Sequence, residues 1–524
     1  MYVFPDPPDG NENFTLNLVA TQCPKTFAML PDEVPDVIVV QIYRPISAGL
    51  FPPGQFPLVV FMHGNGQSGL EYLPVLGPIA QNGFIVASIF LDLDVLDSKA
   101  RRARTLCVAE ALLDGSVTWS GAGKLNGRYA FVGHSTGGLS VFAAAAAIVN
   151  SPAILEGHEL VSVAAIAPNR VLDADVSALT LTGPNAPPYF VLQGTRDGDT
   201  SGGAFSSYDL VRPQLVGGQV TTAPRKALVW AYRVEHNKYG GVVGGCSSSP
   251  LGIALARDYV GAFLLATFYE DPASLDLFFG TASPKLTSAV ADPLHWLAFD
   301  EKPQVYGTSV QQVKPEAGFT AYVLDGFENN DETKSDGGLD VVVNQPYAEA
   351  PANTVDNLHR TNAAFLQWSD GDMIAWTLDA DARTELTGAT SLTFRIGAAV
   401  DVEDQINCSG VIGEVPNLSL LVSDAMNQYP LDLMQYGRLA LPDPGLEDQC
   451  AAPFGTDGCH AWDVMQTTFR VPLADLCSID PNLFLSEISE VALRFNGTGG
   501  LLLLDDVTIH SVPGEAAVDC RCPA

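Results

Sequence analysis

The chain has 524 residues, enough for two or three domains, and 47% of them are hydrophobic. Its formal net charge is −33, from 60 acidic and 27 basic residues, so nucleic acid and anionic membrane surfaces are disfavoured as partners because both repel an acidic protein. No uniformly apolar stretch reaches the roughly 20 residues of a membrane-spanning helix. The first residues lack the pattern of a signal peptide and read as the trimmed start of a mature form.

The first 300 residues alternate short apolar, β-branched runs with helical patterns. Continuous apolar strands separated by helices are typical of an α/β fold, with a doubly wound, mostly parallel sheet covered on both faces. The predicted strands are Val37–Tyr43, Leu58–Met62, Phe84–Phe90, Tyr129–Val132, Tyr189–Gln193 and Ala227–Val234. The predicted helices are Leu73–Asn82, Ala100–Leu113, Gly138–Asn150 and Gly252–Tyr269.

After about residue 300 the pattern changes to short strands between Asp-, Gly- and Pro-rich turns, which is typical of an all-β sandwich. We therefore expect a first domain over 1–302, a linker over 303–317 and a β-sandwich over 318–524. The predicted strands of this part are Ala321–Leu324, Ala364–Trp368, Met373–Leu378, Ser391–Ile396, Leu418–Val422, Thr467–Val471, Val491–Phe495 and Leu501–Leu504.

The nine cysteines indicate disulfides and an oxidising compartment, because six of them crowd into the last 120 residues and no pair has the CxxC spacing of a zinc site. We therefore expect a secreted or extracellular protein. Cys450 and Cys459 bracket a short loop and are a plausible pair. The odd count leaves at least one free thiol, and Cys107, in an apolar stretch, is expected to be a small buried core residue.

The segment Gly133-His134-Ser135-Thr136-Gly137 is a G-x-S-x-G motif between a predicted strand and a predicted helix. In that context the serine sits on a strained strand-to-helix turn, and the two glycines are needed because side chains there would collide. The helix start also directs backbone N–H groups toward a developing negative charge. The motif predicts Ser135 as a nucleophile rather than part of a simple Gly-rich turn.

A second Gly-rich turn follows the predicted strand that ends at Met62. Enzymes with the G-x-S-x-G turn take one oxyanion donor from this loop and another from the residue after the serine. These donors would be the backbone N–H groups of Asn65 and Thr136, with Gly66 as the near alternative. His63 is expected to shape the loop.

A serine hydroxyl needs a base, and the base needs an orienting carboxylate. Asp197 follows the predicted strand Tyr189–Gln193 and is the expected acid, with Asp199 in reserve. His236 follows the next strand in a polar loop and is the expected base. His295 lies in an apolar context that favours a core role.

His134 stands next to the nucleophile, where its side chain should point away from the serine hydroxyl. We expect it to be a packing or supporting residue rather than the base.

Together these residues resemble the α/β-hydrolase superfamily over about residues 35–270. The run up to Gly83-Phe84-Ile85-Val86 is similar to the branch with dienelactone hydrolases, chlorophyllases, platelet-activating-factor acetylhydrolases and polyester-degrading cutinase-like enzymes. The resemblance implies an acyl-enzyme mechanism without a cofactor. Asn65 departs from the aromatic residue that cutinase-like members often have, and Ser135 departs from the cysteine of the dienelactone enzymes.

The second part, about residues 318–512, resembles jelly-roll modules appended to secreted hydrolases, many of which bind carbohydrate. In such modules carboxylates of the first and last strands often hold a structural calcium, and hard oxygen ligands suit that ion. The candidate ligands here are Asp325, Glu328 and Asp506. A solvated acidic turn is the alternative. Three tryptophans could stack on sugars, although a core role is favoured for each: Trp368, Trp376 and Trp462.

These patterns predict a secreted serine carboxylic ester hydrolase whose substrate is an ester, including polyester or lipid-like esters. One alternative is a serine peptidase, since the same triad cleaves amides. The other is a glycan-binding surface protein in which the hydrolase part is only a scaffold. The fold alone does not decide the substrate.

Overall fold

The structure is a computed structural model. In the first part of the chain it describes residues 12–19, 37–45, 53–90, 98–117, 119, 123–171, 179–183, 185–194, 197, 199–200, 204–208, 210–211, 214–216, 219–222, 225–231, 234–241, 250–279 and 295–300. In the remainder it describes residues 312–313, 320–325, 340–344, 363–368, 370–378, 380, 383, 386–387, 389, 391–399, 417–436, 465–479, 483–497 and 500–511.

The first part of the chain contains a nine-stranded mixed sheet with the order β1-β2-β4-β3-β5-β6-β7-β10-β11. Its centre is parallel, because β3 pairs with β4 and β5, and β6 pairs with β5 and β7, all in parallel. At one edge, β1–β2 and β2–β4 are antiparallel. The strands are β1 (Glu12–Val19), β2 (Val37–Arg44), β3 (Phe56–Met62), β4 (Ile85–Phe90), β5 (Leu125–His134), β6 (Glu159–Ile166), β7 (Tyr189–Gly194), β10 (Lys226–Ala231) and β11 (His295–Asp300).

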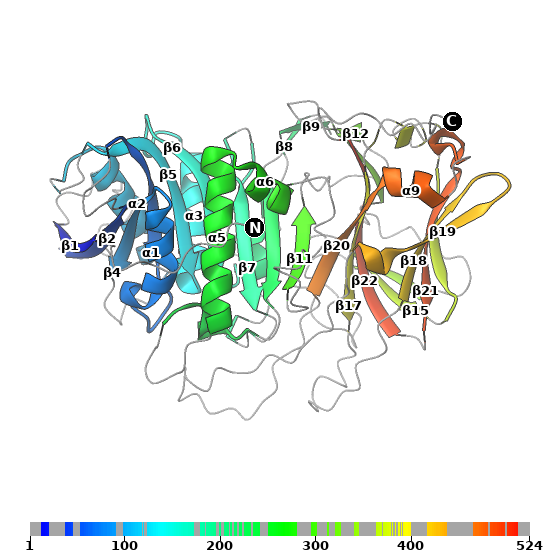
Figure 1. The fold of residues 1–524 in the computed structure, drawn as a ribbon, viewed down its shortest axis with the longest axis horizontal. Coiled ribbons are helices and arrows are strands. Elements are labelled where there is room, and N and C mark those ends of the chain that lie inside the picture. The colour runs from blue at the N-terminus through cyan, green and yellow to red at the C-terminus, as the bar shows by residue number, and fades with distance from the viewer. Residues whose placement is uncertain are drawn as a thin grey trace, which may run out of the picture. The chain divides into compact units, whose positions relative to one another are not determined.

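Four long helices accompany this sheet, and all four lie where the sequence predicts them. They are α1 (Leu73–Gln81), α2 (Ser98–Leu113), α3 (Thr136–Asn150) and α5 (Pro250–Tyr269). Helix α1 packs beside α5, and α2 packs beside α3, so that the two pairs cover opposite faces of the sheet (Figure 1). The shorter elements are η3 (Gly69–Tyr72), α4 (Ala204–Tyr208), β8 (Gln214–Val216), β9 (Gln219–Thr222), η5 (His236–Tyr239) and α6 (Pro272–Phe279).

Burial on both faces explains why the central strands are apolar without alternation. Residues Leu58–Met62 of β3 and Tyr189–Gly194 of β7 are buried throughout. Each large apolar side chain removed from water in this way contributes roughly 1.5–3 kcal/mol to folding. The α/β class predicted from these runs is confirmed at the level of a mixed sheet with helices.

Strands β1, β6 and β11 of this sheet were not predicted from the sequence. The segment Glu159–Ile166 is a short, mostly apolar run, and such a run cannot be told from a helix by periodicity. Its neighbours decide the outcome, because β6 fills the place between β5 and β7.

Helix α5 is long and apolar enough to cross a membrane by length and composition, which the sequence analysis did not anticipate. Of its most apolar window, 61% is buried inside the protein. Phe263 on α5 packs against Phe190 of β7 and Phe278 of α6, so this helix has the contacts of a core helix.

The second part of the chain consists of antiparallel sheets. In one sheet the order is β12-β13-β22-β15-β14, with β17 pairing with both β20 and β22; in the other it is β16-β21-β18-β19. The elements are β12 (Gln312–Val313), β13 (Thr320–Asp325), β14 (Asp340–Asn344), β15 (Ala363–Trp368), β16 (Met373–Thr377), β17 (Ser391–Ala399), β18 (Asn417–Ser423), β19 (Gln428–Asp432), η6 (Leu433–Gln435), β20 (Met465–Pro472), α9 (Leu473–Ile479), η7 (Leu485–Glu487), β21 (Glu490–Asn496) and β22 (Gly500–Ser511).

One hydrophobic core joins residues of both sheets in this part. Trp368 and Trp376 are buried in it, which confirms the core role predicted for these two tryptophans. Trp376 packs near Phe394, and Trp368 near Phe495. Trp462 lies outside the described residues.

Cys107 is buried in α2 as predicted, but the prediction that it is a free core thiol is wrong, because it is disulfide-bonded. Sequence spacing could not identify this bond, since the pairing of cysteines depends on which distant segments meet. Its partner is not among the described side chains. The predicted Cys450–Cys459 pair also lies outside them.

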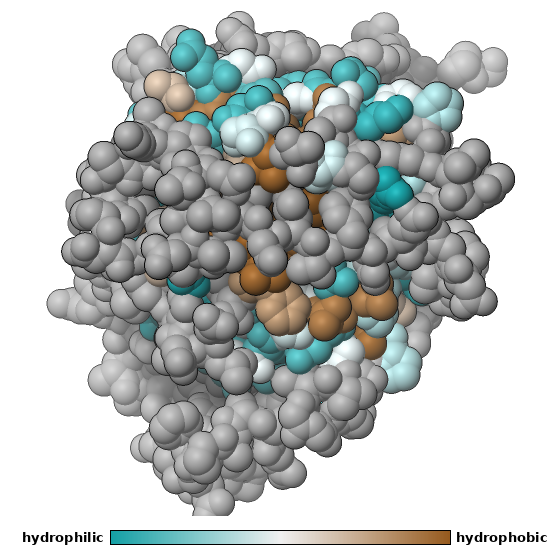
Figure 2. All heavy atoms as spheres, turned by 90° about the vertical axis from the view of Figure 1, so that its left-hand side faces the viewer, coloured by the Kyte–Doolittle hydropathy of each residue, from teal (hydrophilic) through white to brown (hydrophobic). Residues whose placement is uncertain are grey.

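The chain divides into two compact units. The first is made mainly of Met1–Val211 and Ala231–Phe278, and the second mainly of Phe279–Gly445 and Asp457–Ala524. The linker predicted at 303–317 falls, except for β12, outside the described residues, so that boundary stays a prediction. On the face drawn in Figure 2, hydrophobic and hydrophilic side chains of described residues lie side by side.

Candidate active site

Ser135 occupies the sharp turn between β5 and α3, with a φ of 57° and a ψ of −127°. Few residues other than glycine adopt a positive φ, and such strain is held only where the surroundings enforce it. Here the Ser135 N–H donates to the Ile166 carbonyl at 2.9 Å. The Ser135 carbonyl accepts from the N–H groups of Leu139 at 3.1 Å and Asn169 at 3.2 Å. The backbone of the turn is therefore anchored on both sides.

The two glycines of the motif are required by close backbone contacts. A Cβ atom on Gly133 would collide with the Gly137 carbonyl, and one on Gly137 would collide with the carbonyls of Met62 and His63. The steric reason for the G-x-S-x-G pattern predicted from the sequence is thus present in the fold.

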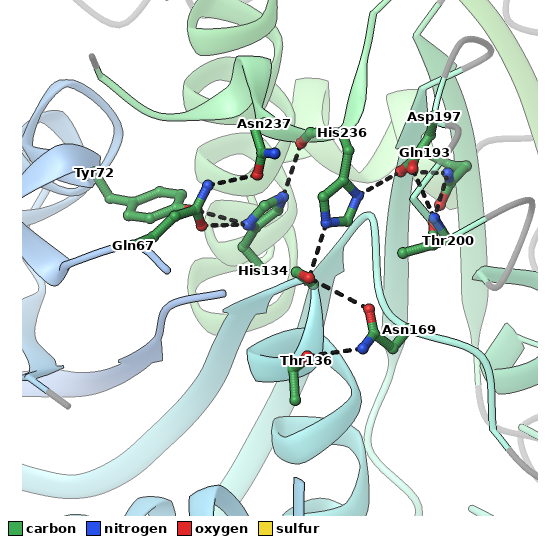
Figure 3. Close-up of polar contacts among 11 residues, drawn as sticks. Gln67, Tyr72, His134, Thr136, Asn169, Gln193, Asp197, Thr200, His236 and Asn237 are labelled. Atoms are coloured by element: carbon green, nitrogen blue, oxygen red, sulfur yellow. Dashed lines mark hydrogen bonds and ion pairs between the residues drawn. The ribbon is translucent and has the colours of Figure 1, made fainter. Parts of the chain in front are cut away.

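Ser135, His236 and Asp197 form a continuous hydrogen-bonded line (Figure 3). His236 Nε2 lies 2.8 Å from Ser135 Oγ, and His236 Nδ1 lies 2.8 Å from Asp197 Oδ2. The three residues are 6%, 4% and 2% exposed, respectively. His236 comes from η5, which follows β10, and Asp197 follows β7. The structure brings together the three side chains that the sequence predicted as nucleophile, base and acid.

The environment of Asp197 favours its ionised form. Burial acts to raise the pKa of this carboxyl group, but the His236 imidazole and the hydrogen bonds from His236 and Thr200 lower it below its usual value. Gln193 Nε2 also donates to Asp197 Oδ2 at 2.8 Å, and the Thr200 N–H donates to Oδ1 at 3.0 Å. Because a carboxylate only accepts, His236 Nδ1 carries the proton and Nε2 presents its lone pair to Ser135.

The other candidates for acid and base do not take these places. Asp199 is exposed, and it is Asp197 whose carboxylate bonds the imidazole of His236. His295 begins β11, and its side chain lies outside the described side chains.

The loop after β3 passes directly against Ser135. A Cβ atom on Gly64 would lie 2.9 Å from the Ser135 Cβ. His63 Nδ1 lies 2.7 Å from the Gly64 carbonyl, and burial lowers the pKa of His63 to about 4, so this imidazole is neutral and donates from Nδ1. His63 thus shapes the loop, as predicted from the sequence.

One predicted oxyanion donor belongs to this loop, and the other belongs to the turn between β5 and α3. Thr136 is the first residue of α3, and Asn65 follows Gly64. Among the described residues, neither backbone N–H donates to a backbone carbonyl of a turn or loop. Their role as oxyanion donors stays a prediction.

A buried polar network contacts the backbone of His236 (Figure 3). His134 Nε2 donates to the His236 carbonyl at 3.0 Å, and His134 Nδ1 lies 2.6 Å from the Tyr72 hydroxyl. Gln67 contacts Tyr72 through its side-chain oxygen and donates from Nε2 to Asn237 Oδ1 at 2.8 Å. Burial, aided by the nearby His236, lowers the pKa of His134 well below 6.5. His134 is therefore a neutral supporting residue that holds the His236 backbone.

Asn169 is a site residue that the sequence analysis missed. Ser135 Oγ lies 3.3 Å from Asn169 Oδ1, and Asn169 Nδ2 donates to Thr136 Oγ1 at 2.7 Å (Figure 3). Asn169 follows β6 at the carboxyl edge of the sheet, where functional side chains gather. Recognition of β6 as a strand would have been the signal, and that strand was not predicted.

The calcium ligands proposed from the sequence lie outside the described side chains. The backbone register pairs Asp325 of β13 with Val507 of β22, next to Asp506. Glu328 is not described. Among the side chains that are described, no group of three or more His, Cys, Asp or Glu residues could hold a metal ion.

Comparison with known proteins adds no relative to this description: no protein-family model matches the sequence, and no curated protein matches it.

Proposed function

We propose that this chain is a secreted serine carboxylic ester hydrolase that acts through an acyl-enzyme. The observation that carries the proposal is the hydrogen-bonded line from Ser135 Oγ through His236 to Asp197, on a positive-φ serine between a strand and a helix. A simple structural role would not require a buried, ionised carboxylate to orient the imidazole that faces a strained serine.

The chemistry follows from these contacts. His236 Nε2 takes the Ser135 proton as Oγ attacks the ester carbonyl, and the N–H groups of Asn65 and Thr136 stabilise the oxyanion. The tetrahedral intermediate expels the alcohol, which receives the proton from His236. Water then attacks the acyl-enzyme by the same route and releases the acid, restoring Ser135. Asp197 stabilises the imidazolium that forms in each step.

The fold and location belong to the same proposal. A parallel sheet centre with an antiparallel edge and helices on both faces supports an α/β-hydrolase fold. Two antiparallel sheets around one core support a jelly-roll-like second part. The disulfide at Cys107 supports an oxidising, extracellular location. Trp368 and Trp376 are buried, so they do not supply a sugar-stacking surface.

Hydrolysis of p-nitrophenyl acetate and butyrate tests this function. We expect turnover by the parent and a loss of at least about 10³-fold in Ser135→Ala. The matched control is Ser151→Ala, at an exposed serine beyond the other end of α3, and it should keep full activity.

Intact-mass detection of a fluorophosphonate adduct gives a second readout. The parent and Ser151→Ala should gain one adduct, and Ser135→Ala none. Cleavage of peptides but not esters would favour the peptidase. Absence of both turnover and labelling in the parent would favour the alternative in which the hydrolase part is only a scaffold.

A further inference from the structure

Arg101 is a buried cation that the mechanism above does not use. It lies on α2, is 1% exposed, and is among the largest fully buried side chains of the described residues. Burial lowers the pKa of Arg101 to about 10, and the charge of Arg104 acts in the same direction, so the guanidinium remains protonated at neutral pH. A buried charge is costly unless it is well hydrogen-bonded, so its partners indicate what it does.

Two of its hydrogen-bond partners belong to the loop that faces Ser135. Arg101 Nη1 donates to the His63 carbonyl at 2.5 Å, and Nη2 donates to Asn65 Oδ1 at 2.9 Å. One rigid guanidinium therefore hydrogen-bonds to the residues on both sides of Gly64. Gly64 in turn is so close to Ser135 that a Cβ atom there would lie 2.9 Å from the Ser135 Cβ. Arg101 thus links helix α2 to the loop that lies against Ser135.

The direction of the Asn65 N–H depends on the peptide planes of this loop. In a trans peptide the N–H points away from the C=O of the same plane. The Gly64 carbonyl is held by His63 Nδ1 at 2.7 Å, which orients the Asn65 N–H in that plane. Arg101 holds the preceding carbonyl and the Asn65 side chain, so it fixes both ends of the segment that carries this donor.

We propose that Arg101 is a positioning residue that holds the Asn65 N–H in place as an oxyanion donor. The inference rests on the proposed ester hydrolase function. An arginine suits this place because its planar fork binds two acceptors at a fixed spacing, whereas a lysine ammonium is a point charge on a flexible stem. The donor matters most when charge develops on the carbonyl oxygen, so its displacement should lower kcat more than it changes KM.

Steady-state kinetics of Arg101→Gln and Arg101→Lys test this proposal. For Arg101→Gln we expect kcat to fall about 10²-fold with KM changed less than about threefold, and the rate of fluorophosphonate labelling to fall in parallel. Arg101→Lys keeps the charge but cannot reproduce the fork, so a loss of about tenfold is expected. The control is Lys99→Gln, which removes an exposed cation from the same helix and should leave kcat unchanged.

Asn65→Ala keeps the N–H but removes the side-chain anchor, and this exposed residue offers a variant that should fold normally. We expect about a fivefold loss of kcat, and a loss in the double variant with Arg101→Gln that is smaller than the product of the single losses. Full kcat in Arg101→Lys or in Asn65→Ala, or a lower melting temperature with unchanged kcat in Arg101→Gln, would overturn the proposal. Failure of the proposed function itself would appear in the parent, as absence of turnover and labelling.

Discussion

His134 and His236 lie close together, with ring centroids 4.8 Å apart, yet they differ in the charge they can carry. Asp197 accepts from His236, whereas His134 faces the Tyr72 hydroxyl, the Gln67 side chain and a backbone carbonyl. Two imidazolium ions at this distance would repel each other, so in the proposed mechanism a proton taken from Ser135 stays on His236, where the carboxylate stabilises it. Neighbours rather than residue type thus decide which histidine is suited to act as the proposed base.

Asn169 offers a test of the electrostatics around the same imidazole. Its Oδ1 is within about 6 Å of His236 Nε2, since both atoms flank Ser135 Oγ. In Asn169→Asp the new carboxylate should favour the protonated imidazole of His236 and move the acid limb of kcat/KM upward in pH. Asn169→Ala is the uncharged control and should leave that limb in place. A pH–rate profile in which both variants keep the parental limb would contradict this expectation.

The loops of five strands, rather than any one segment, build the site. Asn65, Ser135, Asn169, Asp197 and His236 follow β3, β5, β6, β7 and β10 in turn. Because parallel strands end at the same edge of a sheet, residues far apart in sequence meet there. For this reason the order serine, acid, histidine along the chain predicted from the sequence that these three side chains meet.

Substitutions of two glycines test how tightly the turn at Ser135 packs against the end of β3. Gly137→Ala places a Cβ against the Met62 carbonyl, and we expect a loss of about 3 kcal/mol in the free energy of unfolding, or no folded protein. Gly66→Ala meets no atom within 4 Å, and its φ of +66° should cost only about 1–2 kcal/mol. Urea denaturation measures both. Equal losses would show that the close contact at Gly137 is relaxed easily.

The buried histidines make the stability of the protein depend on pH. The folded pKa of His63 is about 4 and that of His134 is also lowered, both from a usual value of 6.5. The unfolded chain therefore binds protons that the folded chain does not, and stability should fall as pH drops from 6.5 toward 4. His63 alone should account for about 1 kcal/mol between about pH 7.5 and pH 5.5.

Chemical denaturation at these two pH values measures the effect. His63→Asn places a non-titrating donor near Nδ1 and should remove the His63 share of the pH dependence. Asp197 acts in a lower pH range. Because its folded pKa lies below the usual value of 3.8, its carboxylate stabilises the fold above pH 3.8, and this contribution is lost as the pH falls further. An unchanged pH dependence in His63→Asn would show that the pKa of His63 is not lowered in the folded state.

Local sequence was sufficient for much of the architecture and for the three central residues of the site. Short-range patterns predicted the apolar runs of β3 and β7, the helices α1, α2, α3 and α5, and the G-x-S-x-G turn. A polar residue directly after a buried strand is also a short-range pattern. Such patterns depend on neighbours within a few positions, so they can be read before the chain is folded.

Only the folded chain revealed Asn169 beside Ser135, Arg101 bound to the loop of His63 and Asn65, and the disulfide of Cys107. It also decided that β6 is a strand. Each of these facts depends on which distant segments become neighbours. Pairing between strands, hydrogen bonds of a buried cation and cysteine connectivity are long-range properties, and no local pattern in the sequence encodes them.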